Sequence, residues 1–465
     1  MLPDCLVDQM KFLVSGGVTR FSLKVFALLL MLAGTGIQLA LAAQLKGAVA
    51  RVDITPPAGL DMWGFASRKG PARKTLDPLY ARVLVLAAGE KRVAIVTLDL
   101  GRSFGPASLE RLQSSARRSS NIGYLLVAAS HTHSGPIVSD NYDYAGGHTP
   151  AWEDAALTHI AEAIDSAAKH VVPVRVGMGY GTTYVGYNRL QTPQSFAHDP
   201  RDPTQIISSP VDPTVGVLRI DTAADGRPMA ILVNYACHAV VLGGENERWS
   251  ADWPAAMATT VEDAFPSHPM TFFLQGGAGD INPYYPNPQD PVRWRDWIGN
   301  RVGQETVRVA KAIETKDEPD GSLDFADDTM TAKTRWNIPA FNEAFRLTWN
   351  PHESYYDPHL GPESTVRTTT LLINKRMAFM SMSGEPFVDL QIDWRSRCPV
   401  HDSFFVGYAN GYNGYIPTIE GAVRGGYGGA SSMTWVAVDS GSRMVDHSVV
   451  RIYEMLGKLT DLPMP

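Results

Sequence analysis

Cysteine is scarce in this sequence, with three in 465 residues, and no C-x-x-C pair or zinc-ribbon spacing is present. This scarcity excludes a thioredoxin-like redox pair and a cysteine-based zinc ribbon. Cys5 lies in an N-terminal segment that we expect to be removed from the mature protein. The sequence leaves open whether Cys237 and Cys398 pair after export or stay as buried thiols.

An excess of positive charge is also absent. Lys and Arg number 41 against 48 Asp and Glu, which gives a net charge of -7, and no basic run interrupts this balance. A nucleic-acid partner is therefore not expected. No repeat with the period of a solenoid or propeller is visible either. The content of hydrophobic residues, 44%, is that of an ordinary globular protein.

One long apolar run is present, near the N-terminus. Lys24 precedes the stretch VFALLLMLAGTGIQLALAA, which ends in Ala40-Leu41-Ala42. This pattern predicts a signal peptide over residues 1–42, with an upstream extension and cleavage near Ala43. We therefore expect a secreted or periplasmic protein. A retained membrane anchor is the alternative, although glycines and polar residues interrupt the apolar run.

Strands and helices interleave along residues 43–465. The stretch ARVLVLAAGEKRVAIVTLDL predicts a hairpin, and a second hairpin turns at Asp225-Gly226 and carries His238 inside its second strand. Apolar residues at helical spacing predict helices in AWEDAALTHIAEAIDSAAKHV, ADWPAAMATTVEDAF, VRWRDWIGNRVGQETVRVAKAIE and SRMVDHSVVRIYEML. We therefore predict a layered α/β protein with mixed β-sheets and flanking helices, in one large domain. If that domain has two lobes, a polar stretch near residues 315–330 marks their boundary.

Unusual polar residues stand at or just beyond the ends of five apolar runs. They are His131 and His133 after YLLVAAS, His238 in ILVNYACHAVVL, Asp280 and Asn282 after TFFLQGGAG, Glu385 after RMAFMSMSG, and Tyr412 and Tyr415 after SFFVGYANG. In layered α/β folds, side chains from the carboxyl ends of several strands converge on one crevice. We therefore expect these residues to share one site.

Two histidines one residue apart suit a metal site. On an extended segment, residues i and i+2 point to the same side, so His131 and His133 can face one ion. Catalytic zinc needs about three His, Asp or Glu ligands and an open position for water. The residues alone leave other interpretations open: hydrogen bonding for the two histidines, a core position for His238, and a helix N-terminal acid for Glu385. They indicate a metal hydrolase and no more.

Several motifs together resemble the catalytic domain of the neutral/alkaline non-lysosomal ceramidases. The motifs are AASHTHSGP, NYACHAVVL, SADWP, GGAGDINP, SGEPF and ANGYNGYIPT, and they occur in the order of that family. These ceramidases are zinc amidases that cleave ceramide into sphingosine and a fatty acid. The resemblance therefore implies a zinc-dependent amidohydrolase whose substrate is a lipid or another N-acyl amide.

The resemblance also implies roles for individual residues. Zinc would be held by His131, His238, Glu385 and Tyr415. His133 would act as acid or base near the scissile bond, and Arg189 and Tyr427 would stabilise the oxyanion with Asn282. Asp252 and Asp280 would orient histidine ligands, or else serve only in helix capping and a turn.

This sequence departs from the family in two respects. The family's GDVSP-type loop carries a Ser where this chain has Asn282, and an amide cannot be a serine-type nucleophile. If zinc-activated water attacks instead, the Asn282 NH2 group could still stabilise the oxyanion. The second departure is that the family carries an immunoglobulin-like domain after the catalytic one, which we do not expect in a chain that stops at Pro465.

Three functions follow as hypotheses. The first is a zinc-dependent, ceramidase-like hydrolase of an N-acyl amide. The second is a zinc hydrolase of another amide or an ester, which the change to Asn282 favours. The third is a noncatalytic exported binding protein. The lipid substrate suggests peripheral contact with a membrane, and the sequence does not define the oligomeric state.

Overall fold

The computed structural model describes residues 44–65, 68–138, 151–190, 210–284, 289–317, 321–337, 339–340, 361–430 and 433–459. The predicted signal peptide and its cleavage site lie outside these residues. Among the described residues, no helix combines the length and the apolar content that a membrane-spanning segment needs.

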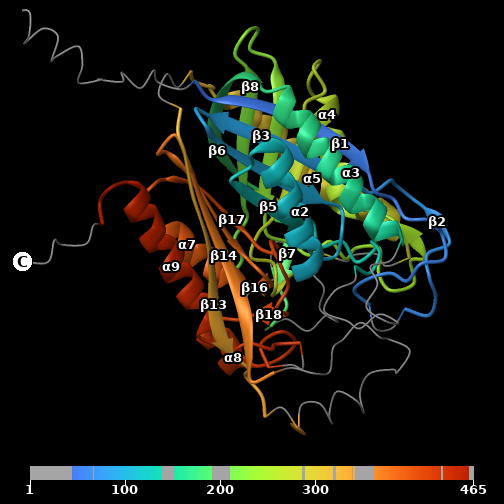
Figure 1. Ribbon diagram of the computed structural model, residues 1–465. Helices are drawn as coiled ribbons and strands as arrows, with labels where there is room; N and C mark the ends of the chain where they lie inside the picture. Colours follow the sequence, from blue (N-terminus) through green and yellow to red (C-terminus); the bar gives the residue numbers. More distant parts are fainter. Residues whose placement is uncertain are drawn as a thin grey trace, which may run out of the picture. The chain divides into compact units, whose positions relative to one another are not determined.

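The largest element of the fold is an eight-stranded mixed sheet (Figure 1). Its strands, in spatial order, are β11 (Met270–Gln275), β9 (Pro228–Tyr235), β8 (Thr214–Thr222), β6 (Val172–Thr182), β1 (Lys46–Asp53), β3 (Tyr80–Ala88), β4 (Lys91–Leu98) and β5 (Tyr124–Ala129). The pairs β4–β5 and β9–β11 are parallel, and the other neighbours are antiparallel. Both predicted hairpins, β3–β4 and β8–β9, are present.

A second sheet of four strands packs against the first. It contains β13 (Leu323–Lys333), β14 (Glu363–Ile373), β15 (Met377–Met382) and β17 (Asp402–Val406). One apolar core joins the two sheets, with Leu126, Leu218 and Leu232 from the first and Leu371 and Phe404 from the second. Because side chains alternate along each strand, the opposite face of each sheet remains to be covered by helices.

Helices cover both outer faces. The large sheet carries α2 (Pro106–Ser120), α3 (Ala151–Lys169), α4 (Trp253–Asp263) and α5 (Pro291–Ala312), and the small sheet carries α7 (Val388–Arg397) and α9 (Ser440–Met455). In Figure 1, the red helix α9 lies beside the orange strands β13 and β14, and α7 packs against α9 and β17. The layers are therefore helices, sheet, sheet and helices, and the predicted layered α/β architecture is confirmed.

Short elements complete the fold around the ends of the strands. They are the strand pairs β2 (Lys74–Thr75) with β10 (Arg248–Trp249), β7 (Gly186–Asn188) with β12 (Ile281–Pro283), and β16 (Glu385–Pro386) with β18 (Tyr415–Ile416), and the helix α8 (Ile419–Arg424). The ends of the edge strands β5 and β11 also lie close together in this region: the Gln275 side chain, at the end of β11, donates a hydrogen bond to the Ser130 carbonyl, just after β5, at 3.1 Å.

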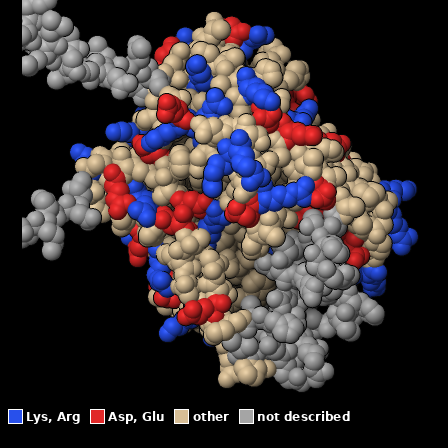
Figure 2. Space-filling model, viewed as in Figure 1, with Lys and Arg blue, Asp and Glu red and all other residues tan. Residues whose placement is uncertain are grey.

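On the face shown in Figure 2, Lys and Arg side chains are interspersed with Asp and Glu. Cys237 and Cys398 are both free thiols, so they do not pair with each other; Cys237 is buried as one alternative expected, and Cys398 is half-buried. The stretch near residues 315–330 lies where the chain passes from α5 to β13. That it divides two lobes stays a prediction.

Candidate metal centre

His131 stands just beyond the end of β5. Its backbone N–H donates to the Leu100 carbonyl at 2.9 Å, and its φ of +63° lies in the left-handed region that non-glycine residues seldom adopt. The imidazole Nδ1 is 2.6 Å from the Gly101 carbonyl oxygen. A carbonyl only accepts, so Nδ1 carries a hydrogen and Nε2 is the ring nitrogen left to face the site.

His238 is held in the same way from the other edge of the sheet. Its Nδ1 lies 2.6 Å from the Ala278 carbonyl oxygen and 3.1 Å from that of Ile281. Its Nε2 is therefore the lone-pair nitrogen, and this atom is buried without a hydrogen-bond partner among the described residues.

The prediction that His238 lies inside a strand is wrong. Strand β9 ends at Tyr235, where its parallel neighbour β11 also ends at Gln275. Beyond that pair, the Gln275 side chain accepts a hydrogen bond from the Cys237 N–H at 3.1 Å, and the His238 N–H turns to the Ile281 carbonyl at 3.0 Å. The chain leaves the sheet where its pairing with both β11 and β8 ends, and His238 lies in the loop beyond, beside the site.

Glu385 supplies a buried carboxylate from β16. Its Oε2 atom is 3.2 Å from the His131 Nε2 and 3.3 Å from the His238 Nε2. Its Oε1 atom accepts a hydrogen bond from the Tyr412 hydroxyl. Residues from three separate parts of the chain thus direct lone pairs at one point.

The charges at this point favour a cation. Burial, followed by the charge of Arg189, lowers the pKa of His238 to about 4, so its ring is neutral at pH 7. Burial alone would raise the pKa of Glu385, but the neighbouring His131 and His238 outweigh it and hold that pKa well below its usual value. The neutral His238 ring and the ionised Glu385 carboxylate then present two donor atoms to one point. These residues fit a divalent metal ion, because zinc takes just such donors.

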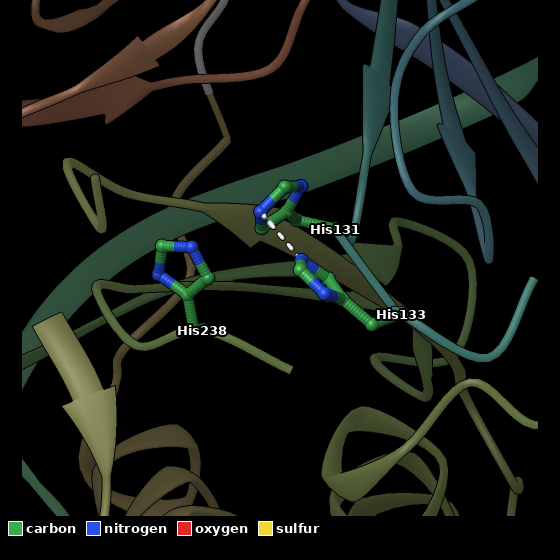
Figure 3. A group of neighbouring side chains, drawn as sticks. All are labelled: His131, His133 and His238. Atoms are coloured by element: carbon green, nitrogen blue, oxygen red, sulfur yellow. Dashed lines mark hydrogen bonds between the residues drawn. The ribbon is translucent and has the colours of Figure 1, made fainter. Parts of the chain in front are cut away.

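His133 lies beside this point, on the same segment as His131. Figure 3 shows the rings of His131, His133 and His238 directed toward one another. One nitrogen of each ring lies within 4.8 Å of the others, so the three histidines could also hold a metal ion. The Nε2 atoms of His133 and His131 are 3.2 Å apart. Burial, followed by the charges of His131 and His238, lowers the pKa of His133 well below its usual value, so its ring is neutral at pH 7.

Arg189 joins the predicted oxyanion residues to the predicted metal ligands. Its guanidinium donates to the Asn282 Oδ1 at 3.0 Å, to the Gly279 carbonyl at 2.7 Å and to the Tyr415 hydroxyl at 2.8 Å. Its Cζ atom lies 4.9 Å from the ring centroid of Tyr427. The structure therefore gathers Arg189, Asn282, Tyr415 and Tyr427 into one group, although their chemical roles stay predictions.

Tyr415 and Tyr427 differ in exposure within that group. Their ring centroids are 5.4 Å apart, yet Tyr415 is buried and Tyr427 is 54% exposed. Tyr415 belongs to β18, which pairs with the Glu385 strand β16, so its backbone position is tied to that carboxylate. Its hydroxyl accepts from Arg189, and a bond from Tyr415 to a metal stays a prediction.

The two aspartates expected beside the histidines hold backbone and amide groups instead. Asp280 accepts hydrogen bonds from the Val388 N–H at 2.8 Å and from the Asn188 amide at 2.6 Å. Asp252 caps α4 by accepting from the Trp253 N–H. Backbone carbonyl groups, and not these carboxylates, fix the rings of His131 and His238. The capping and turn interpretation is therefore the one that the structure supports.

Asp280 gives a prediction about stability. Burial, opposed by its bonds to Val388 and Asn188, raises its pKa from 3.8 to about 7. Between pH about 4 and 7 the unfolded chain releases this proton while the folded protein retains it, so the free energy of unfolding should fall by up to about 4 kcal/mol. Asp280→Asn does not titrate, and should gain that amount relative to the wild type over the same interval. Urea unfolding of the metal-free proteins across this interval measures the difference.

The matched control for this measurement is Asp225→Asn. A hydrogen bond from Thr222, followed by bonds from Arg227, lowers the pKa of Asp225 to about 2. Its effect on stability should therefore be lost only below pH about 4, so this variant should follow the wild type at higher pH. If Asp280→Asn also follows the wild type between pH about 4 and 7, the raised pKa of Asp280 is refuted.

The sequence analysis expected Tyr412 in the site without giving it a role, and it missed Tyr408. Tyr412 donates its hydroxyl hydrogen to Glu385. Tyr408 was not considered, and its ring stacks on the His131 imidazole. The order ANGYNGY places both beside the predicted ligand Tyr415, and this proximity was the only available signal.

The fold and the site together define an α/β protein with a buried histidine and carboxylate centre suited to a metal. Residues 47–289 match the family model for the N-terminal part of the neutral/alkaline non-lysosomal ceramidases. The chain belongs to this family.

Individual relatives agree with this assignment. The neutral ceramidase of Mycobacterium tuberculosis (strain ATCC 25618 / H37Rv) is 25% identical over 178 residues, which is 36% of this chain and 28% of that relative. The crystal structure of the neutral ceramidase from Pseudomonas aeruginosa matches with a TM-score of 0.71 and 18% identity, and the match covers 90% of this chain and 76% of that one. A structure described as ceramidase complexed with C2 matches with a TM-score of 0.71 and 17% identity, over 91% of this chain and 77% of that one. These solved structures share the fold of this chain.

Proposed function

We propose that this protein is a zinc-dependent hydrolase that cleaves the N-acyl amide bond of ceramide or a closely related lipid. The observation that carries this proposal is the convergence of the His131 and His238 Nε2 atoms on the Glu385 Oε2, at 3.2 and 3.3 Å. Both rings are buried and braced so that their lone pairs face that oxygen. Membership of the ceramidase family supports the choice of an amide substrate.

His131, His238 and Glu385 would hold the metal, with Tyr415 as the fourth ligand. A bound zinc ion would polarise the amide carbonyl and make a water molecule nucleophilic near neutral pH. His133 would accept a proton from the attacking water and return it to the leaving amine, a role that suits an imidazole whose Nε2 lies 3.2 Å from that of His131.

The oxyanion would be stabilised by the group around Arg189. Three acceptors fix the guanidinium, and its partial burial strengthens its attraction to a developing negative charge. The Asn282 Oδ1 is occupied by Arg189, which leaves the amide NH2 as the donor end of that side chain. Tyr427 lies over the same guanidinium and would donate from the exposed side.

A second candidate keeps the metal and the attacking water but acts on another amide or an ester. It is favoured by one observation, the bond from Arg189 to Asn282 at the position where the family carries Ser. An amide at this position changes the shape and the donors beside the scissile bond. The third hypothesis, a noncatalytic binding protein, has no comparable support, because binding alone does not require water-activating ligands.

Metal analysis combined with a substrate panel tests these proposals. The purified protein should contain close to one zinc per chain and should hydrolyse ceramides faster than N-acyl amino acids or simple esters. Short-chain and long-chain fluorescent ceramides report how much acyl chain the site requires. Zinc binding without hydrolysis of any amide would contradict the amidase proposal, and preferred cleavage of esters or N-acyl amino acids would favour the second candidate.

The N-terminal pattern supports a further part of the proposal, that the protein is exported and acts outside the cytoplasm. The N-terminus of protein recovered from the periplasm or the medium should begin near Ala43. An intact N-terminus on a membrane-bound protein would instead support the retained anchor.

A further inference from the structure

The short segment of residues 407–410, which follows β17, connects three parts of the candidate metal centre. The Gly407 N–H donates to the Gln275 carbonyl at 2.9 Å, at the end of β11. The Tyr408 N–H donates to the Gly384 carbonyl at 2.8 Å, beside Glu385, and the Tyr408 carbonyl accepts from the Ala129 N–H at 3.1 Å. This segment therefore fixes the chain next to the Glu385 carboxylate relative to the end of the strand that leads to His131.

The Asn410 side chain strengthens the same connection. Its Oδ1 accepts from the Val127 N–H at 2.8 Å, and its amide donates to the Leu125 carbonyl at 3.2 Å. The free edge of β5 is thereby paired with this segment rather than with another strand. The backbone groups on both sides of Tyr408 are therefore hydrogen-bonded, as buried backbone groups generally are.

Tyr408 itself lies directly against His131. The two ring centroids are 4.2 Å apart with an interplanar angle of 29°, so the rings are stacked. The Tyr408 side chain is fully buried, and its hydroxyl has no hydrogen-bond partner among the described residues. Its φ of +55° lies in the left-handed region, as does the φ of +63° at His131. Two uncommon backbone conformations at one contact indicate that surrounding structure enforces the stack.

We propose that Tyr408 is a positioning residue for the metal centre, acting through the face of its ring on the His131 imidazole. The Gly101 carbonyl fixes one edge of that imidazole, but a single hydrogen bond leaves the ring free to tilt about the bond. The stacked Tyr408 ring restricts this tilt and keeps the Nε2 atom directed at Glu385. This inference rests on the proposed function, because it assigns His131 as a metal ligand.

The test compares Tyr408→Leu with Tyr408→Phe in the full-length protein. None of the three side chains is branched at Cβ, so the backbone strain at +55° is similar in all of them. Loss of the ring should weaken zinc binding about 10- to 100-fold, the range seen when residues that orient metal ligands are replaced. Phenylalanine retains the ring and should restore zinc affinity to within about twofold. Competition with a chromophoric chelator measures the affinity, and the visible spectrum of the cobalt-substituted protein reports the ligand geometry.

Phe404→Leu is the matched control for loss of a buried ring. Phe404 is also fully buried and belongs to the adjoining strand β17, but it packs on Phe379 in the core between the sheets. This variant should lower the melting temperature and leave zinc affinity unchanged. If Tyr408→Leu fails to fold, Tyr408→Met replaces it, because the flexible thioether fills irregular space without supplying a ring.

The outcomes distinguish this inference from the proposed function. If the wild type binds no zinc, the proposed function fails at its metal and the role of Tyr408 fails with it. If the wild type binds zinc and Tyr408→Leu binds it equally well, only the positioning role is overturned. Equal losses in the Leu and Phe variants would also overturn it, since they would assign the effect to the hydroxyl.

Discussion

Replacing His131 with alanine should release the proposed zinc ion and lower amide hydrolysis by at least about 10³-fold. The His131 Nε2 lies 3.2 Å from the Glu385 Oε2, so its loss removes one of the donors that converge there and leaves a buried carboxylate facing an empty volume. A metal that contributes several kcal/mol to the transition state accounts for a change of this size. Zinc content by elemental analysis and kcat/KM on a ceramide measure the two effects.

An exposed histidine provides the control for this substitution. His170 follows α3 on the surface, where its Nδ1 contacts the Ser166 carbonyl, and His170→Ala should keep both zinc and activity. Full zinc occupancy in the His131→Ala protein would remove His131 from the ligand set. Loss of zinc without loss of activity would instead separate the metal from the reaction.

Replacing Asn282 with alanine should lower kcat/KM about 10²- to 10³-fold while zinc content stays at the wild-type value. The substitution removes a donor from the predicted oxyanion site and takes away the acceptor that holds the Arg189 guanidinium at 3.0 Å. Loss of one preorganised donor costs about 3 kcal/mol in comparable sites. The decrease should lie mainly in kcat, because the oxyanion develops only in the transition state.

Asn282→Ser provides a second comparison at the same position. The serine hydroxyl is shorter than the amide and should not reach Arg189, so we expect ceramide hydrolysis to stay below that of the wild type. A large gain in ceramide hydrolysis would show that Asn282 limits this substrate, and would favour the second candidate function for the natural protein. An Asn282→Ala protein with full activity would exclude a role for this side chain in either reaction.

Much of the fold could be predicted because its signals are local. The β3–β4 and β8–β9 hairpins follow from apolar runs broken by turn residues, and α3 and α5 follow from helical spacing. The packing of one sheet on the other could not be predicted, because the contact between Leu126 and the second sheet joins residues far apart in the sequence. Alternation along a strand indicates that a face is buried but not what buries it.

In the candidate site too, local patterns in the sequence predicted some residues and not others. Strand ends identified His131 and Glu385, and the structure brings their side chains together. The prediction that β9 continues through His238 was wrong, because the pairing of β9 with β11 ends at Tyr235 and the apolar run of the sequence does not mark that point. Tyr408 gave no signal at all, since its left-handed backbone and its stack on His131 depend on partners from other strands.

Peptide carbonyl groups hold both imidazole rings, so the rings should keep their orientation in acid. The oxygen atoms of Gly101 and Ala278 take up no proton at any pH that the folded chain survives, so the orientation of each ring persists as the solution is acidified. Acid should then displace a bound metal by protonating the ring nitrogens and the Glu385 carboxylate that would hold it. Neutralisation in the presence of the metal should therefore restore the centre.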